Sequence, residues 1–96
     1  MSDDVPGEDP YNRLAGGRAR AVLEYLARQI VDDPEVVEVE SAGGDDRRPV
    51  RLSLKVAPGD VGRVIGRRGR TAQAIRAVTR AAAARDGEEV FVDIAD

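Results

Sequence analysis

The chain has 96 residues, with 15 basic and 18 acidic side chains, and contains neither cysteine nor histidine. This length indicates one domain, because domains typically run to roughly 100–150 residues. The missing residue types exclude disulfides, thiolate zinc sites, Cys nucleophiles and Ser-His-Asp catalysis, so we expect no enzyme and no cofactor. The net charge of -3 and a sequence pI of about 5.0 also argue against nucleic-acid binding through bulk charge.

The first 16 residues are expected to form an acidic, disordered tail in front of a single domain over 17–96. They carry four acids and two prolines, with too little apolar surface to offset the entropy of ordering. They lack the basic and apolar regions of a signal peptide, and no stretch of the chain approaches the roughly 20 apolar residues of a membrane span. We therefore expect a cytoplasmic protein that does not associate with a membrane.

Hydrophobic periodicity predicts one helix followed by two strands. Apolar residues recur at helical spacing over 18–31, and Pro34 ends this amphipathic helix. Apolar and polar side chains alternate over 35–41 and again over 50–56, which is typical of half-buried strands. The short glycine-containing link over 42–46 predicts that these strands form a hairpin.

Two helices and a last strand are predicted for the rest of the chain. Asp60 is a candidate cap for a short helix over 61–65, and a second helix is expected over 70–85. Asp86-Gly87 ends this second helix, and 90–94 alternates as a strand. The residues of the long helix expected to face the core are Ala72, Ile75, Val78 and Ala82. The order α-β-β-α-α-β predicts an α+β domain with helices packed on one face of a three-stranded sheet.

Charge is segregated along the chain. Residues 1–60 and 86–96 each balance at -5, whereas residues 61–85 hold seven arginines and no acid. This +7 segment can attract an anion despite the opposite total, because exposed charges interact over a screening length of about 8–10 Å. Segregation alone is more typical of a solvated helical face than of a binding site.

The loop Gly66-Arg67-Arg68-Gly69 lies within this basic segment, between the two predicted helices. Glycines permit a tight turn and the close approach of another backbone. We expect the turn to direct backbone N–H groups and the next helix N-terminus toward one point, which suits phosphate oxygens. A Gly-x-x-Gly string alone is common, however, and an ordinary inter-helix turn is its leading explanation.

The residues around the loop carry a resemblance to a known family. Val61-Gly62-Arg63-Val64-Ile65-Gly66-Arg67-Arg68-Gly69-Arg70 resembles the V-I-G-x-x-G signature of KH domains, which clamp about four nucleotides at a GXXG loop. The predicted element order is that of the type II KH arrangement. More narrowly, 22–94 is similar to the small single-KH RNA-binding proteins of the KhpA family. The segments that carry this closer match are Leu23-Glu24-Tyr25-Leu26, Val56-Ala57-Pro58, Asp60-Val61-Gly62 and Arg70-Thr71-Ala72-Gln73-Ala74-Ile75-Arg76.

The resemblance implies that single-stranded RNA enters a groove between the loop and the second strand, with the loop arginines on phosphates. The implied RNA-binding residues are Gly66, Arg67, Arg68, Gly69, Arg63 and Arg70, with Arg76 and Arg80 as candidates for an extended basic track. The family's role would be that of an RNA chaperone or post-transcriptional regulator linked to cell-wall homeostasis and cell length. Its members are homodimers or partners of a larger protein with KH and Jag domains.

A protein-interaction module is the alternative interpretation. In it the GXXG loop is only a structural turn, and apolar residues around Phe91 or on the long helix form a dimer or docking contact. RNA modules that stack bases on aromatic platforms are disfavoured, since the chain has two tyrosines and one phenylalanine. The acid pairs Asp32-Asp33 and Asp45-Asp46 fall in turns, where capping is the default role and a weak divalent-cation site the alternative.

Overall fold

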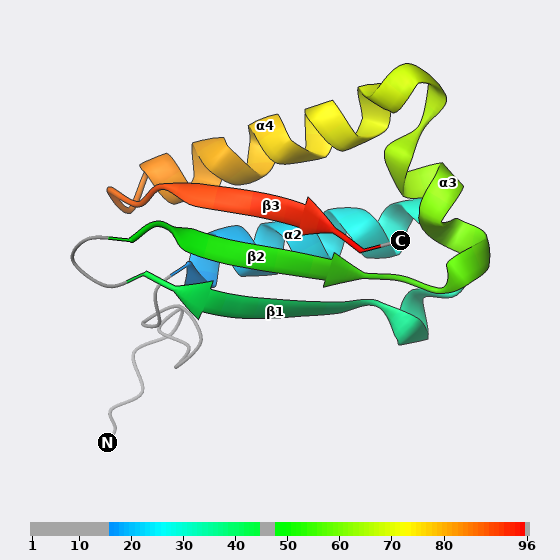
Figure 1. The fold of residues 1–96 in the computed structure, drawn as a ribbon, viewed down its shortest axis with the longest axis horizontal. Coiled ribbons are helices and arrows are strands. Elements are labelled where there is room, and N and C mark those ends of the chain that lie inside the picture. The colour runs from blue at the N-terminus through cyan, green and yellow to red at the C-terminus, as the bar shows by residue number, and fades with distance from the viewer. Residues whose placement is uncertain (1–15, 45–47, 96) are drawn as a thin grey trace.

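The computed structural model of this chain describes residues 16–44 and 48–95. The expected disordered tail therefore lies outside the described residues except for Gly16, as do Asp45 and Asp46 of the hairpin link. The elements in chain order are α2 (Gly17–Ile30), β1 (Glu38–Gly43), β2 (Val50–Lys55), α3 (Val61–Ile65), α4 (Arg70–Ala84) and β3 (Val90–Ile94) (Figure 1). The predicted order α-β-β-α-α-β is confirmed.

The strands form a mixed sheet in the order β1-β2-β3. β1 pairs antiparallel with β2, as the predicted hairpin requires, and β3 pairs parallel with β2. Parallel neighbours need a long crossover, which α3 and α4 supply. Figure 1 shows α2 behind the strands and α4 running alongside β3. No helix among the described residues covers the other face of the sheet, so the prediction of helices on one face is confirmed.

The hydrophobic core lies between the sheet and the helices. Leu23 of α2, Leu52 and Leu54 of β2 and Val64 of α3 are fully buried. Burying a side chain of this size contributes about 1.5–3 kcal/mol. The helix α3 has only five residues, too few to be stable through its own hydrogen bonds. Burial of Val64 therefore holds this helix against the core.

The first strand begins later than the alternation predicts. Residues Pro34–Val36 form a 3₁₀ turn, and β1 starts at Glu38. Pro34 accounts for this turn, because its fixed φ suits the first position of a helical turn and it has no N–H to donate to a ladder. The alternation itself holds, with Val37 and Val39 buried.

The prediction that Val78 faces the core is wrong. Val78 is 49% exposed, and Thr79 is fully buried in its place. The Thr79 hydroxyl donates to the backbone carbonyl of Ile75 at 2.7 Å, which removes the cost of burying an unpaired polar group. Position 79 also keeps the helical spacing from Ile75. A pattern built from apolar residues alone passes over this threonine.

Within the described ranges, no helix has both the length and the apolar character that crossing a membrane requires.

Candidate nucleic-acid interface

The loop at 66–69 makes a tight turn between α3 and α4. The amide of Gly69 donates to the carbonyl of Gly66 at 3.2 Å. Gly66 has φ 76° and ψ 173°, a region open almost only to glycine. A Cβ at position 66 would also stand 2.6 Å from the Cβ of Thr71, so both backbone angle and space require glycine there. Gly69 has φ 72°, and among the described atoms a Cβ at this position would meet nothing within 4 Å.

Arg68, at the tip of the loop, has a left-handed backbone with φ 58° and ψ 26°. It is the non-glycine residue with positive φ in the described part of the chain. This conformation costs an arginine about 1–2 kcal/mol, and strained positions of this kind cluster at functional sites. The neighbouring Arg67 is exposed like Arg68.

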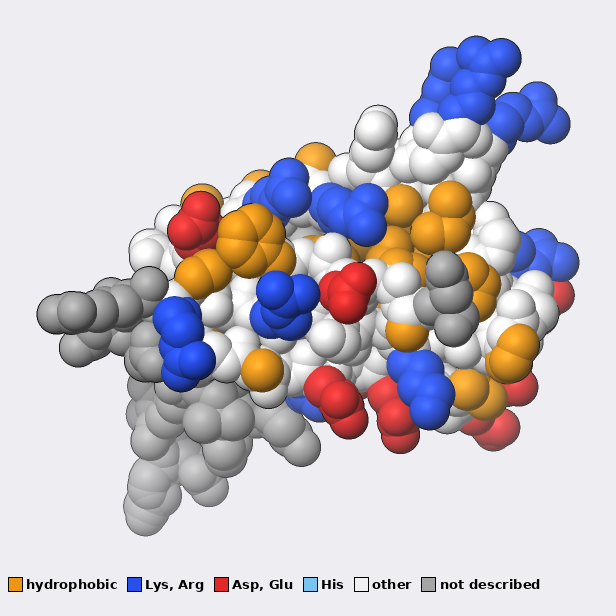
Figure 2. Space-filling view, in the orientation of Figure 1, with side chains coloured by type: hydrophobic (Ala, Val, Ile, Leu, Met, Phe, Trp, Pro, Cys, Tyr) orange, Lys and Arg blue, Asp and Glu red, His pale blue; other side chains and the backbone are white. Residues whose placement is uncertain are grey.

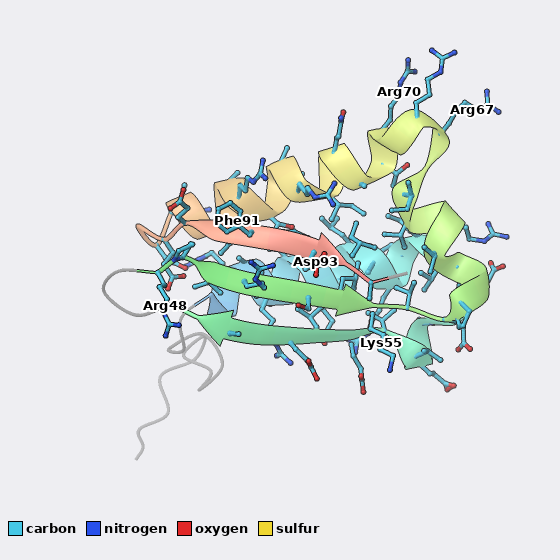
Figure 3. The ribbon with its side chains drawn as sticks, viewed as in Figure 1. Arg48, Lys55, Arg67, Arg70, Phe91 and Asp93 are labelled. Atoms are coloured by element: carbon cyan, nitrogen blue, oxygen red, sulfur yellow. The ribbon has the colours of Figure 1, made fainter. Side chains whose placement is uncertain are left out.

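The arginines of the loop project into solvent. Figure 3 shows Arg67 and Arg70 at the junction of α3 and α4, both pointing away from the body of the protein. The space-filling view shows blue side chains gathered at this tip without red ones, and orange side chains between the tip and the end of β3 (Figure 2). Over residues 16–44 and 48–95, no ion pair involves Arg67, Arg68 or Arg70. Their positive charge is available to an anion.

Arg63 is held differently. Its Nη2 lies 2.9 Å from Oδ2 of Asp32, and its Nε lies 3.6 Å from Oδ1 of Asp60. Two carboxylates thus offset its charge, and the side chain joins the end of α2 to the start of α3. The structure does not place Arg63 among the unpaired cations of the loop.

Asp60 is buried, with 4% of its surface exposed. Its two carboxylate oxygens each accept a backbone N–H at 3.1 Å, from Asp32 and from Asp33. The prediction that Asp60 caps the short helix is right about its position and wrong about its partner, because its side chain makes no capping bond to α3. The amides just after α2 lack helical acceptors, since Pro34 starts a new turn there, and Asp60 supplies them. It thereby fixes α3, and the loop, against α2.

Arg76 and Arg80 lie beyond the loop on α4. Arg76 is half-buried, and its Nε donates to the carbonyl of Val92 in β3 at 3.3 Å. Arg80 is exposed. The bond from Arg76 to Val92 shows that the strand beside α4 is β3. The second strand, β2, is central and paired on both sides, so β3, and not the second strand, lies next to the helix that follows the loop.

Among the described side chains, no group of three or more Asp or Glu residues could hold a metal ion. Asp32 and Asp33 occupy a turn where their backbone amides serve Asp60. The second acid pair, Asp45-Asp46, lies outside the described residues.

A GXXG loop between two helices, attached to a mixed three-stranded sheet in the order α-β-β-α-α-β, defines a KH-like domain of type II. The family model described as the KH domain of KhpA and KhpB matches residues 20–94. The chain belongs to this KhpA/KhpB KH-domain family, as the relatives below also indicate.

Several curated relatives carry the name RNA-binding protein KhpA. The one from Clostridium acetobutylicum is 44% identical over 75 residues, which is 78% of this chain and 97% of the relative. The one from Streptomyces coelicolor is 46% identical over 74 residues, which is 77% of this chain and 87% of the relative. The one from Halalkalibacterium halodurans is 40% identical over 77 residues, or 80% of this chain and 99% of the relative.

Proposed function

We propose that this protein binds short single-stranded RNA at the loop Gly66-Arg67-Arg68-Gly69. The observation that carries the proposal is the set of three exposed arginines without ion pairs in the described residues, around a turn that requires glycine at position 66. RNA phosphates are the matching ligand, because each can accept charge-assisted hydrogen bonds from a guanidinium. The names of the curated relatives support RNA as the partner.

The loop residues have separate roles in this proposal. Gly66 and Gly69 let the sugar-phosphate backbone approach the turn closely, because neither carries a Cβ. Arg67 and Arg68 contact phosphates, and Arg70 adds positive charge at the start of α4. We expect Arg63 to act through Asp32 and Asp60, by holding α3 in place.

Arg76 and Arg80 extend the basic track along α4 toward β3. The bond from Arg76 to Val92 fixes the direction of this side chain, and its remaining donors are compatible with a phosphate at the groove edge. Catalysis forms no part of the proposal. We further propose a cytoplasmic RNA chaperone or post-transcriptional regulator linked to cell-wall homeostasis and cell length, on the basis of the family resemblance.

The loop assignment is tested by replacing Arg67 and Arg68 together with Gln. Binding of a short unstructured RNA is then titrated at several salt concentrations. The slope of log K against log salt is negative, and the loss of two phosphate contacts should make it less steep by roughly 1.4, at about 0.7 per contact for single strands. A thermal unfolding curve checks that the variant folds.

The matched control replaces Arg18 and Arg28 with Gln, which changes the net charge by the same amount. Both lie on α2 and form ion pairs, with Asp86 and Glu24 respectively. This control should keep the wild-type slope. Equal slopes for the loop variant and the wild type would refute the loop assignment.

A second proposal concerns partners, and one surface favours it. Val78 is 49% exposed on α4, and Ala74 and Ala81 near it are exposed as well. At about 100° per residue these positions lie on the flank of α4 away from Arg76 and Arg80. We propose a homodimer, or a pair with a larger KH- and Jag-domain protein, through this flank. Sedimentation of the variant with Arg67 and Arg68 replaced by Gln measures its oligomeric state. A dimer formed by protein contacts should persist in this variant, whereas an assembly that depends on RNA should not.

A further inference from the structure

The far end of α4 from the loop holds a second set of residues suited to nucleic acid. A depression of about 470 Å³ lies there, lined by Arg80, Glu88, Glu89, Val90 and Phe91. Phe91 is 47% exposed, an unusual state for the single phenylalanine of the chain. Figure 3 shows its ring beside α4, at the opposite end of the molecule from Arg67 and Arg70.

Phe91 lies between two exposed arginines on different elements. Arg51 is its register partner on β2, on the open face of the sheet. Arg80 reaches the depression from α4. Over the described residues no ion pair involves either of them. An exposed aromatic face with unpaired guanidinium groups beside it is the combination that binds single strands, by stacking a base and pairing its phosphate.

Acidic side chains also approach this place. The carboxylate of Glu88 accepts a hydrogen bond from the backbone amide of Gly16 at 2.9 and 3.1 Å and keeps its negative charge. Glu89 lines the depression and is exposed, and Asp93 is exposed two residues beyond Phe91 on the same strand. These three charges oppose an anion, so the base rather than the phosphate must provide most of the contact. Stacking on an aromatic ring suits this requirement because it does not depend on charge.

We propose that Phe91, with Arg80 and Arg51, forms a second RNA subsite that stacks a base outside the four nucleotides held at the loop. This inference rests on the proposed function of the loop. Ten residues of α4 separate Arg70 from Arg80, which corresponds to about 15 Å along the helix axis. An RNA must therefore be longer than the loop alone requires to reach both places. Arg76, bonded to Val92 between them, lines the path.

The test compares two unstructured RNAs, one of about four nucleotides, the length that a KH loop clamps, and one of about twelve. Phe91→Ala should weaken binding of the longer RNA by about fivefold or more and leave the shorter one unchanged. Phe91→Leu keeps apolar bulk at the site and should weaken the longer RNA similarly, because it lacks the aromatic face. Arg80→Gln and Arg51→Gln should each make the salt dependence less steep by at most about 0.7, and for the longer RNA only.

Tyr25→Ala is the matched control. Tyr25 is 63% exposed on α2, which lies behind the sheet in Figure 1, so losing its ring should change neither affinity. If the wild type binds neither RNA, the proposed function fails. If it binds both and Phe91→Ala weakens them equally or not at all, the loop assignment survives and the second subsite is overturned. A change in sedimentation without a change in RNA affinity would also overturn it, in favour of a protein contact at Phe91.

Discussion

Arginines within α3 and just after it behave in opposite ways. Within α3, Arg63 is paired with Asp32 and lies near the buried Asp60. Just after α3, Arg67, Arg68 and Arg70 surround the glycine loop and make no ion pair within the described residues. These four arginines lie within eight consecutive residues and have the same charge. The difference comes from residues elsewhere in the sequence, because Asp32 reaches Arg63 only through the fold.

The two groups of arginines differ in whether their charge is already paired. At the α2–α3 junction (Asp32, Asp60 and Arg63), the arginine forms ion pairs with the two carboxylates, and these contacts fix the position of the loop. The loop leaves its charges unpaired and accepts backbone strain at Arg68. A rigid support beneath an exposed, strained turn allows the arginines to meet a ligand without first reorganising the backbone.

The largest effect should come from the loop glycines, which differ although the motif treats them alike. Gly66→Ala should lower the free energy of unfolding by about 3 kcal/mol, since it adds a forbidden backbone angle to an overlap with Thr71. Gly69→Ala should cost only about 1 kcal/mol, because its Cβ would point into open space and only the left-handed angle is unfavourable. Urea denaturation of both variants measures the difference. Equal losses would mean that Thr71 yields to the new methyl group.

The motif alone could not predict this difference. Both glycines follow from the need for a turn, and the sequence indicates the loop, its flanking helices and the segregated arginines correctly. The overlap with Thr71 depends on how α4 begins after the turn, which local sequence does not determine. The sequence thus predicts that a glycine turn forms here, but not how much each of its residues contributes to stability.

The fold was predictable wherever one face of an element is apolar. The alternation in β2 and the helical spacing in α2 identified these elements, because burial selects residues at the period of the backbone. The parallel pairing of β3 with β2 and the partners of Asp60 could not be read in this way. Both join residues that are far apart in the chain, and no local period records such contacts.

A smaller effect is expected at the α2–α3 junction. Asp60→Ala should lower the free energy of unfolding by about 2 kcal/mol, because it leaves the amides of Asp32 and Asp33 without their acceptor. Asp32→Ala is the control, since its own side chain is 72% exposed and its ion pair with Arg63 should contribute less than about 1 kcal/mol. Thermal unfolding monitored by circular dichroism compares the two. If Asp32→Ala cost as much as Asp60→Ala, the ion pair rather than the buried carboxylate would hold the junction.

The smallest effect tests the comparison of arginines directly. Arg70→Gln should make the negative slope of log K against log salt less steep by about 0.7, because each arginine that contacts a phosphate releases about 0.7 counterions from single-stranded RNA. Arg63→Gln removes the same charge only seven residues earlier and should leave the slope unchanged, since Asp32 and Asp60 already offset that charge. Both titrations use the same short RNA under conditions where each variant is fully folded.

The two slopes separate two views of a basic segment. If RNA responds to the summed field of residues 61–85, Arg63→Gln and Arg70→Gln should lower the slope equally, because screening over about 8–10 Å does not distinguish close neighbours. If only unpaired guanidinium groups contact phosphates, Arg70→Gln should make the slope less steep and Arg63→Gln should leave it unchanged. We expect the second result, because a guanidinium already paired with carboxylates must break those pairs before it can contact a phosphate and displace a counterion from the RNA. Equal slopes would mean that the net +7 of the segment, and not its local pairing, determines RNA affinity.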